Sequence, residues 1–244
     1  MSISEKGNSK PINCSDMKNG LLIMLVLATA VTASAQKVIE KHMPLSANGF
    51  VSMNFQISDS IRIVTWKKNE VYVKSSIDVN DNKDNDEYKM SFEESAGTVE
   101  IRGKLEWEKG RGCWGSDSGR RSNNNGDCCC NCRSRIIHDV YIPENTDFSV
   151  ETINGNIVIS GNTGRVKAHS ISGYIDLSFA PERPAQLLMR TITGTMYSNF
   201  DFPAESGKPK HVGGGSVSAE LNGGGGKRID LETISGDIFF RKES

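Results

Sequence analysis

Apolar and polar residues repeat at nearly constant intervals along residues 148–241. Four phrases share a core of Thr or Ser, Ile, one variable residue and Gly, and their glycines lie 18, 21 and 42 residues apart. The interval of 42 is two periods of 21, and a further glycine stands at its midpoint. A fixed period near 20 residues predicts a repeat architecture. The repeat glycines are Gly155, Gly173, Gly194, Gly215 and Gly236.

Within each copy, apolar residues are spaced by two, as in a β-strand with one buried face. They stand seven and five positions before the glycine, and again two and four positions after it. The position two before the glycine is also apolar. It breaks the alternation and predicts a bulge or bend ahead of it. We therefore expect the isoleucines at this position to face the interior: Ile153, Ile171, Ile192 and Ile234.

The copies predict an all-β fold, a parallel β-helix or β-solenoid with rungs of about 20 residues. Each copy would supply two short strands joined at a corner, and layers stacked at about 4.8 Å would bury a column of Ile, Val and Leu. An antiparallel β-sandwich with similar strands is the alternative. The fourth copy departs from the pattern, because Lys208 and Lys210 replace its first apolar pair. Its first strand is expected to be a surface excursion.

The strand pattern also covers the region ahead of the repeats. Segments 61–66 and 71–77 alternate apolar with polar residues, and segments 88–92 and 98–102 resemble the next pair of strands. Beyond residue 36 no segment keeps the helical period of about 3.6 residues. We therefore expect almost no helix there.

Residues 17–35 have the pattern of a secretory signal peptide. Lys18 lies in a short basic start, residues 21–28 form an apolar run, and Ala33-Ser-Ala35 offers the small residues of a cleavage site. The run is too short to span a bilayer comfortably. Residues 1–16 are expected to be a non-native extension upstream of a start at Met17. The protein is thus predicted to be exported to the periplasm, the outer cell surface or the medium.

The charge balance gives no sign of an acidic partner. Removing residues 1–35 takes away three basic and two acidic residues, which changes the net charge from −1 to −2. That value implies neither a nucleic acid nor an anionic membrane as partner. We expect one folded unit, with an N-terminal β region at 36–108, a cysteine-rich loop at 109–135 and the repeats at 136–244.

Several features together resemble the DUF4097 family, whose members carry the label adhesin and are common in Bacteroidetes envelopes. They are the leader, the segment Ile-Arg-Ile-Val-Thr-Trp-Lys-Lys-Asn-Glu-Val-Tyr-Val at 61–73, the glycines at 223–226 and the phrase Thr-Ile-Ser-Gly-Asp-Ile at 233–238. The resemblance covers about residues 37–241 and implies a β-solenoid in the envelope. Its motifs are structural, so it carries over no binding residues. The cysteine-rich loop fits the family pattern least.

All five cysteines after residue 36 lie in the cysteine-rich loop. In an oxidising compartment the first interpretation is disulfide bonding, for which a bond from Cys113 to one of the other four is geometrically favoured. Five is odd, so at least one thiol is free or pairs with another chain. Capture of Cu(I) or Zn by thiolates is the alternative, although only one C-x₂-C pair is present. The disulfide candidates are Cys113, Cys128, Cys129, Cys130 and Cys132, and the metal candidates are Cys128, Cys130 and Cys132.

Two other groups of residues invite a chemical role. The glycines at 223–226 precede Lys227, but Leu221 and Arg228 occupy positions where a phosphate loop needs Gly and Ser or Thr. Solenoid corners account better for these glycines. His138 beside Asp139 is interpreted as the polar edge of a strand. The position four before the glycine is predicted to face outward and holds Glu151, His169, Arg190 and Glu232.

These observations favour an exported, non-enzymatic, adhesin-like β-solenoid that offers a rigid face to a cell-surface polysaccharide or an envelope protein. No catalytic residue and no cofactor are expected. The first alternative is a polysaccharide-active β-helix enzyme that uses the outward Glu, Arg and His side chains. The second is a thiol or metal sensor built on the cysteine-rich loop. Neither a nucleic-acid partner nor a membrane span after cleavage is expected.

Overall fold

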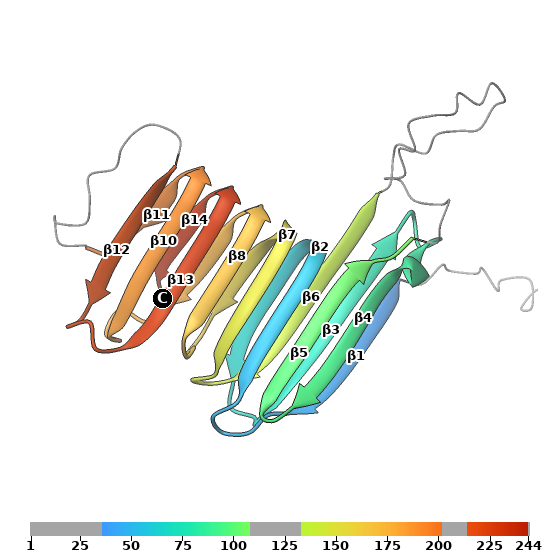
Figure 1. Ribbon diagram of the computed structural model, residues 1–244, viewed down its shortest axis with the longest axis horizontal. Coiled ribbons are helices and arrows are strands. Elements are labelled where there is room, and N and C mark those ends of the chain that lie inside the picture. Colours follow the sequence, from blue (N-terminus) through green and yellow to red (C-terminus); the bar gives the residue numbers. More distant parts are fainter. Residues whose placement is uncertain (1–35, 108–132, 202–213, 244) are drawn as a thin grey trace, which may run out of the picture. The chain divides into compact units, whose positions relative to one another are not determined.

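The computed structural model describes residues 36–107, 133–201 and 214–243, which form fourteen β-strands (Figure 1). Their only helical segment is a 3₁₀ turn at Asn85–Glu87, so the all-β prediction is confirmed for these residues. None of their helical structure has the length and apolar character needed to cross a bilayer. The strands are β1 (Lys37–Pro44), β2 (Phe50–Trp66), β3 (Glu70–Val79), β4 (Tyr88–Ser95), β5 (Thr98–Leu105), β6 (Ser134–Pro143), β7 (Asp147–Ser160), β8 (Val166–Ser172), β9 (Ile175–Phe179), β10 (Ala185–Thr193), β11 (Met196–Ser198), β12 (Gly215–Leu221), β13 (Lys227–Ser235) and β14 (Ile238–Lys242).

The strands form one mixed, mostly parallel sheet. Its main path runs β1-β3-β6-β2-β7-β8-β13-β10-β12, and a second row pairs β9, β14 and β11 in parallel behind β8, β13 and β10 (Figure 1). Antiparallel pairing occurs at β1–β3, β3–β6, β4–β5 and β10–β12. Each of three repeat copies thus supplies one strand to each row. This parallel pattern is compatible with solenoid-like stacking.

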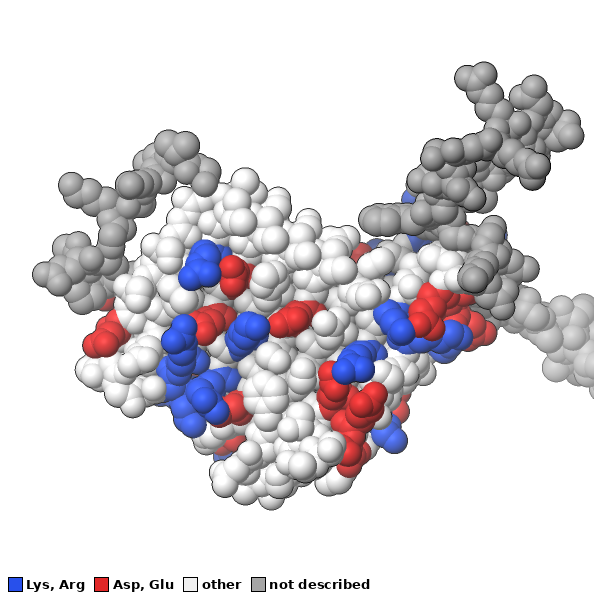
Figure 2. Space-filling model, in the orientation of Figure 1, with Lys and Arg blue, Asp and Glu red and all other residues white. Residues whose placement is uncertain are grey.

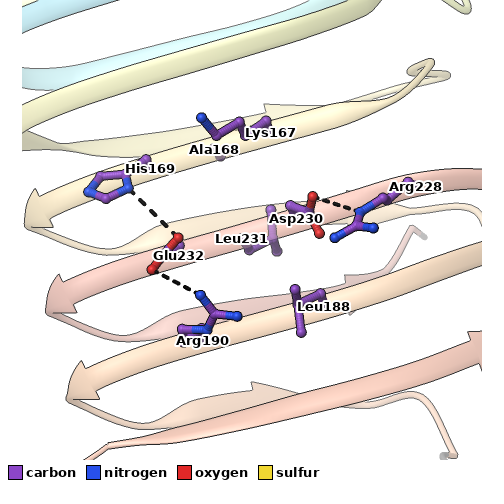
Figure 3. Close-up of a pocket in the computed structure, with 9 residues that line it drawn as sticks. All are labelled: Lys167, Ala168, His169, Leu188, Arg190, Arg228, Asp230, Leu231 and Glu232. Atoms are coloured by element: carbon purple, nitrogen blue, oxygen red, sulfur yellow. Dashed lines mark hydrogen bonds and ion pairs between the residues drawn. The ribbon is translucent and has the colours of Figure 1, made fainter.

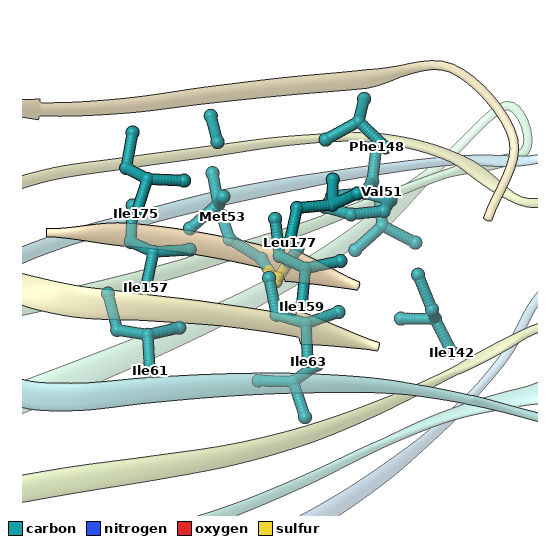
Figure 4. Packing of buried hydrophobic residues seen from close by; sticks show 14 of the residues in the cluster. Val51, Met53, Ile61, Ile63, Ile142, Phe148, Ile157, Ile159, Ile175 and Leu177 are labelled. Atoms are coloured by element: carbon teal, nitrogen blue, oxygen red, sulfur yellow. The ribbon is translucent and has the colours of Figure 1, made fainter. Parts of the chain in front are cut away.

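Buried side chains from the two rows meet in a single main core. Because the parallel strands pair in register, like residues lie over one another, and Figure 4 shows two such columns. Each fully buried aliphatic side chain contributes about 1.5–3 kcal/mol relative to exposure. The first column contains Ile61, Ile157 and Ile175, and the second contains Ile63, Ile159 and Leu177.

The repeat copies do not stack in the order of the chain. The last copy, β13–β14, lies between the copy β8–β9 and the copy β10–β11. Its position requires the chain to leave β10–β11, return as the antiparallel strand β12 and then pass around β10 before entering β13. A sequence period gives the shape of a rung but not the order of the rungs.

The glycines at 223–226 lie in the connection from β12 to β13. The prediction that they form solenoid corners is therefore wrong. Asn222 Nδ2 donates hydrogen bonds to the carbonyls of Pro181 (2.7 Å) and Arg183 (3.0 Å), which anchors the connection to the start of β10. A side chain at Gly226 would overlap the carbonyl of Pro184. Glycine is required there because two backbones approach closely.

Gly215 also differs from the predicted series of corners. It begins β12, which runs antiparallel to β10, and it lies opposite Thr191. Gly173, Gly194 and Gly236 each stand between two strands of one rung, and Gly155 lies within the long strand β7, whereas Gly215 starts a single strand. The fourth phrase therefore resembles the others in sequence without forming a stacked rung.

The isoleucines two before each glycine face solvent, which contradicts the prediction. Ile153, Ile171, Ile192 and Ile234 are 50, 40, 55 and 37% exposed. The alternation continues unbroken to the position three before the glycine, and the change of face falls at the corner itself. The buried residues at that position are Thr152, Ser170, Thr191 and Thr233.

Buried hydroxyls at this position tie the corners of neighbouring rungs together. Three of the four donate to the carbonyl of the corner glycine on the adjacent copy, and a hydrogen bond of this kind contributes about 1 kcal/mol. These hydrogen bonds explain how a polar side chain is buried at this position, while the isoleucine that follows it, which was predicted to be buried, faces solvent. The pairs are Ser170 Oγ with Gly155 O (3.2 Å), Thr233 Oγ1 with Gly173 O (3.4 Å) and Thr191 Oγ1 with Gly236 O (3.1 Å).

Candidate binding face

The outer face of β7, β8, β13 and β10 arranges the polar repeat positions in rows. Parallel pairing in register sets each residue four before the glycine beside its counterpart on the next strand. We call this set the charged row. In spatial order it consists of Glu151, His169, Glu232 and Arg190.

Glu232 is the centre of the charged row (Figure 3). Its Oε1 lies 3.5 Å from Arg190 Nη1, and its Oε2 lies 4.0 Å from His169 Nδ1. Glu151 at the end of the row pairs with Lys167 Nζ at 3.2 Å. All these groups are partly exposed to water, so each pair contributes at most about 1 kcal/mol. Their charges are available to a partner at little energetic cost.

A depression of about 170 Å³ lies beside the charged row, towards the starts of the strands (Figure 3). Leu188, which is partly exposed on the outer side of β10, contributes apolar surface to it. At its edge Arg228 Nε donates to Asp230 Oδ2 at 2.8 Å, and this hydrogen bond and charge raise the pKa of Arg228. The other carboxylate oxygen of Asp230, Oδ1, is buried and has no hydrogen-bond partner among the described residues.

The four solvent-facing isoleucines form a second row on the same face, two residues along each strand from the charged row. We call them the isoleucine row, and register places them in the order Ile153, Ile171, Ile234, Ile192. Neighbouring strands lie about 4.8 Å apart, so the row extends over about 15 Å across the four strands. A groove of about 370 Å³ lies at its end, between the charged row and the isoleucine row. A row of exposed large apolar side chains is a feature of interaction surfaces.

Charges on this face are nearly balanced. Figure 2 shows basic and acidic side chains close together over these strands. Each of the four acidic residues lies within 4.0 Å of at least one of the five basic residues. The face is therefore not a strongly basic patch. The basic residues are Arg165, Lys167, Arg190, Lys227 and Arg228, and the acidic residues are Asp147, Glu151, Asp230 and Glu232.

The carboxylates that an enzyme would use are held apart by β8. Glu151 on β7 and Glu232 on β13 are two strand spacings apart, which places their backbones about 10 Å from each other. Both contact basic side chains on an open surface. The arrangement is that of a cross-strand ladder of opposite charges, which stabilises a sheet.

His138 lies in the interior, so its interpretation as a polar strand edge is wrong. Its Nδ1 is 2.7 Å from Ser75 Oγ, its Nε2 is 3.0 Å from the hydroxyl of Tyr88, and its ring stacks on Phe55 at 4.0 Å. Burial lowers the pKa of His138 to about 3 and raises the pKa of Tyr88. A side chain at Gly103 would overlap the Tyr88 hydroxyl, so this glycine makes room for the group. The sequence signal was a histidine in phase with Ile136, Val140 and Ile142, the buried residues of β6.

The cysteine candidates lie outside the described residues. Cys113, Cys128, Cys129, Cys130 and Cys132 fall within 108–132, so both the disulfide and the metal hypotheses stay predictions. Strand β6 begins at Ser134, one residue before the predicted end of the cysteine-rich loop at residue 135. In the part of the chain that the structure covers, no three His, Cys, Asp or Glu residues are grouped as metal ligands.

Comparison with known proteins identifies the fold. No family model matches the sequence, and no curated protein matches it. Among solved structures, a protein of Clostridium sporogenes described as a "putative cell adhesion protein" aligns with a TM-score of 0.53 at 12% identity. The alignment covers 86% of this chain and 100% of that one. At this identity the similarity establishes the architecture alone.

A second solved structure carries a related description. It is a "putative adhesin" of Bacteroides fragilis, with a TM-score of 0.22, 9% identity and coverage of 86% of this chain and 99% of that one. At this TM-score the second match supports no conclusion about the fold or the role of this chain.

Proposed function

We propose that this chain is an exported, non-enzymatic, adhesin-like envelope protein whose solenoid-like stack binds a partner protein through its outer face. The leader pattern at 17–35 supports export, and the fold shared with the Clostridium protein supports an adhesion role. The observation that carries the proposal is the isoleucine row, which runs beside the charged row on four strands in register. Both rows are fixed to a hydrogen-bonded sheet, so binding requires little ordering.

A protein partner fits this face better than an acidic polysaccharide. Protein interfaces combine an apolar centre with a polar rim, and the isoleucine row, the charged row and the groove between them have that arrangement. An acidic polymer would require excess positive charge, whereas five basic residues here face four acidic ones.

Charging the isoleucine row should remove binding without unfolding the protein. We expect the double variant Ile171→Lys, Ile234→Lys to bind isolated cell envelopes at least about tenfold more weakly, because two apolar contacts become desolvated charges. Binding is measured with the labelled protein at increasing concentration. Both isoleucines are exposed in the free protein, so its thermal unfolding should change little.

The controls separate the partner classes. The variant Val38→Lys adds one lysine at an exposed position on β1 and should bind like the unmodified protein. Protease treatment of the envelopes should abolish binding, whereas periodate oxidation of their sugars should not. The reverse result would replace the protein partner with a polysaccharide. Release of reducing ends that disappears in Glu151→Gln would contradict the non-enzymatic assignment.

A further inference from the structure

The sheet formed by the described residues has four terminal strands, and these differ in how well they are protected from pairing with another chain. Among the described residues, β1 pairs only with β3, β4 only with β5, β11 only with β14 and β12 only with β10. A terminal strand presents unpaired backbone N–H and C=O groups along one side. Proteins commonly block such edges with charges, with proline or by keeping the strand short.

Three of the four edges carry one of these protections. Strand β1 has Lys37, Glu40, Lys41 and Pro44 among its eight residues. Strand β4 has Lys89, Glu93 and Glu94 among its eight. Strand β11 has only three residues. Each is a poor template for a further strand.

Strand β12 carries almost no protection. Its seven residues, Gly-Ser-Val-Ser-Ala-Glu-Leu, contain one charge and no proline. Ser216, Ser218 and Glu220 are exposed on the outer side, while Ala219 and Leu221 are buried and Val217 packs against the main core. Exposed and buried side chains therefore alternate along β12 as they do in the interior strands, although β12 stands at an edge of the sheet.

We propose that β12 pairs antiparallel with β12 of a second copy of this chain, so that the main path of the sheet continues across the dimer axis. A two-fold axis at Ser218 pairs all seven residues and sets Ser218 opposite itself, with Ser216 opposite Glu220 of the second copy. No like charges then face each other, which is the condition for stable cross-strand pairing. The buried sides of the two β12 strands would extend the two apolar cores towards each other.

This dimer would double the candidate binding face. The outer face of β10 continues onto β12, because Arg190 lies opposite Ser216. Two copies joined at β12 would thus present two charged rows and two isoleucine rows on one continuous sheet. Simultaneous contact at both would raise the apparent affinity for a partner with repeated sites. The pairing itself does not depend on the proposed adhesin role.

The experiment measures the molar mass of the protein by analytical ultracentrifugation from micromolar to millimolar concentration, with a reductant present to exclude cysteine cross-links. One seven-residue strand pair is a small interface, so we expect a concentration-dependent equilibrium of monomer and dimer. Ser218→Lys and Ser218→Glu should each remain monomeric, because the two-fold axis sets identical charges opposite each other. An equimolar mixture of the two variants should dimerise again, because lysine then faces glutamate.

The matched control is Val38→Lys, which adds the same charge to β1 and should dimerise like the unmodified protein. Circular dichroism confirms that each variant is folded, as expected for changes at exposed positions. An unmodified protein that is monomeric throughout the range overturns the proposal. So does a dimer that persists in Ser218→Lys, or a mixture of the two charged variants that stays monomeric.

Discussion

Replacing Gly173 with alanine is expected to lower the free energy of unfolding by at least about 3 kcal/mol. Gly173 has a φ of +126°, which residues with a side chain rarely adopt. A Cβ there would overlap the carbonyl oxygen of Gly155 and lie 2.8 Å from its carbon. That carbonyl also accepts the hydrogen bond from Ser170, so moving it would cost a second interaction. Unfolding in urea measures the loss.

Gly225→Ala is the matched control for this prediction. Gly225 lies in the connection between β12 and β13, its φ is outside the positive range, and a Cβ there would have no atom within 4 Å. Its replacement should change the unfolding free energy by less than about 0.5 kcal/mol. Similar losses in the two variants would show that close packing at the corners does not control stability.

Acid is expected to destabilise the protein through His138. The folded state keeps the ring neutral to about pH 3, whereas the ordinary pKa is 6.5, so the unfolded chain binds an extra proton between these values. The stabilisation is therefore complete above about pH 6.5 and is lost as the pH falls towards 3. Between pH 7 and about pH 4 this one group should account for about 3 kcal/mol.

Comparison with His138→Gln isolates the contribution of this histidine. Glutamine does not titrate, so the difference in unfolding free energy between the unmodified protein and this variant should shrink by about 3 kcal/mol from pH 7 to about pH 4. Carboxylates that titrate in both proteins cancel from the difference. A difference that stays constant with pH would contradict burial of a neutral ring.

Strand positions could be read from the sequence because they depend on local alternation. The segments at 61–66, 71–77, 88–92 and 98–102 all lie within observed strands. The charged row also followed from alternation, since parallel stacking turns equivalent positions into neighbours. The isoleucine row did not, because the pattern assigns isoleucine to the interior. The hydrogen bonds from Ser170, Thr191 and Thr233 to the corners of adjacent copies show why hydroxyls are buried instead.

The spatial order of the strands could not be predicted from the sequence, for a different reason. Copies with nearly equal faces can pack on one another in several orders at similar energy, so the period could not show that β13 stands between β8 and β10. Gly215 was wrongly predicted to be a corner glycine for the same reason. Its phrase matches the others locally, but its strand runs in the opposite direction. The buried contacts of His138 likewise join β3, β4 and β6, which only the tertiary fold brings together.

Disulfide cross-linking tests the stacking order most directly, in a background where all native cysteines are serine. His169 lies opposite Glu232 on the neighbouring strand, whereas Arg190 lies one strand further away. A disulfide needs Cα atoms within about 7 Å, and two strand spacings exceed that distance. The pair His169→Cys, Glu232→Cys should therefore oxidise readily, and the pair His169→Cys, Arg190→Cys should stay reduced. A bond in the second pair and none in the first would show that the copies stack in chain order, and would contradict the face described above.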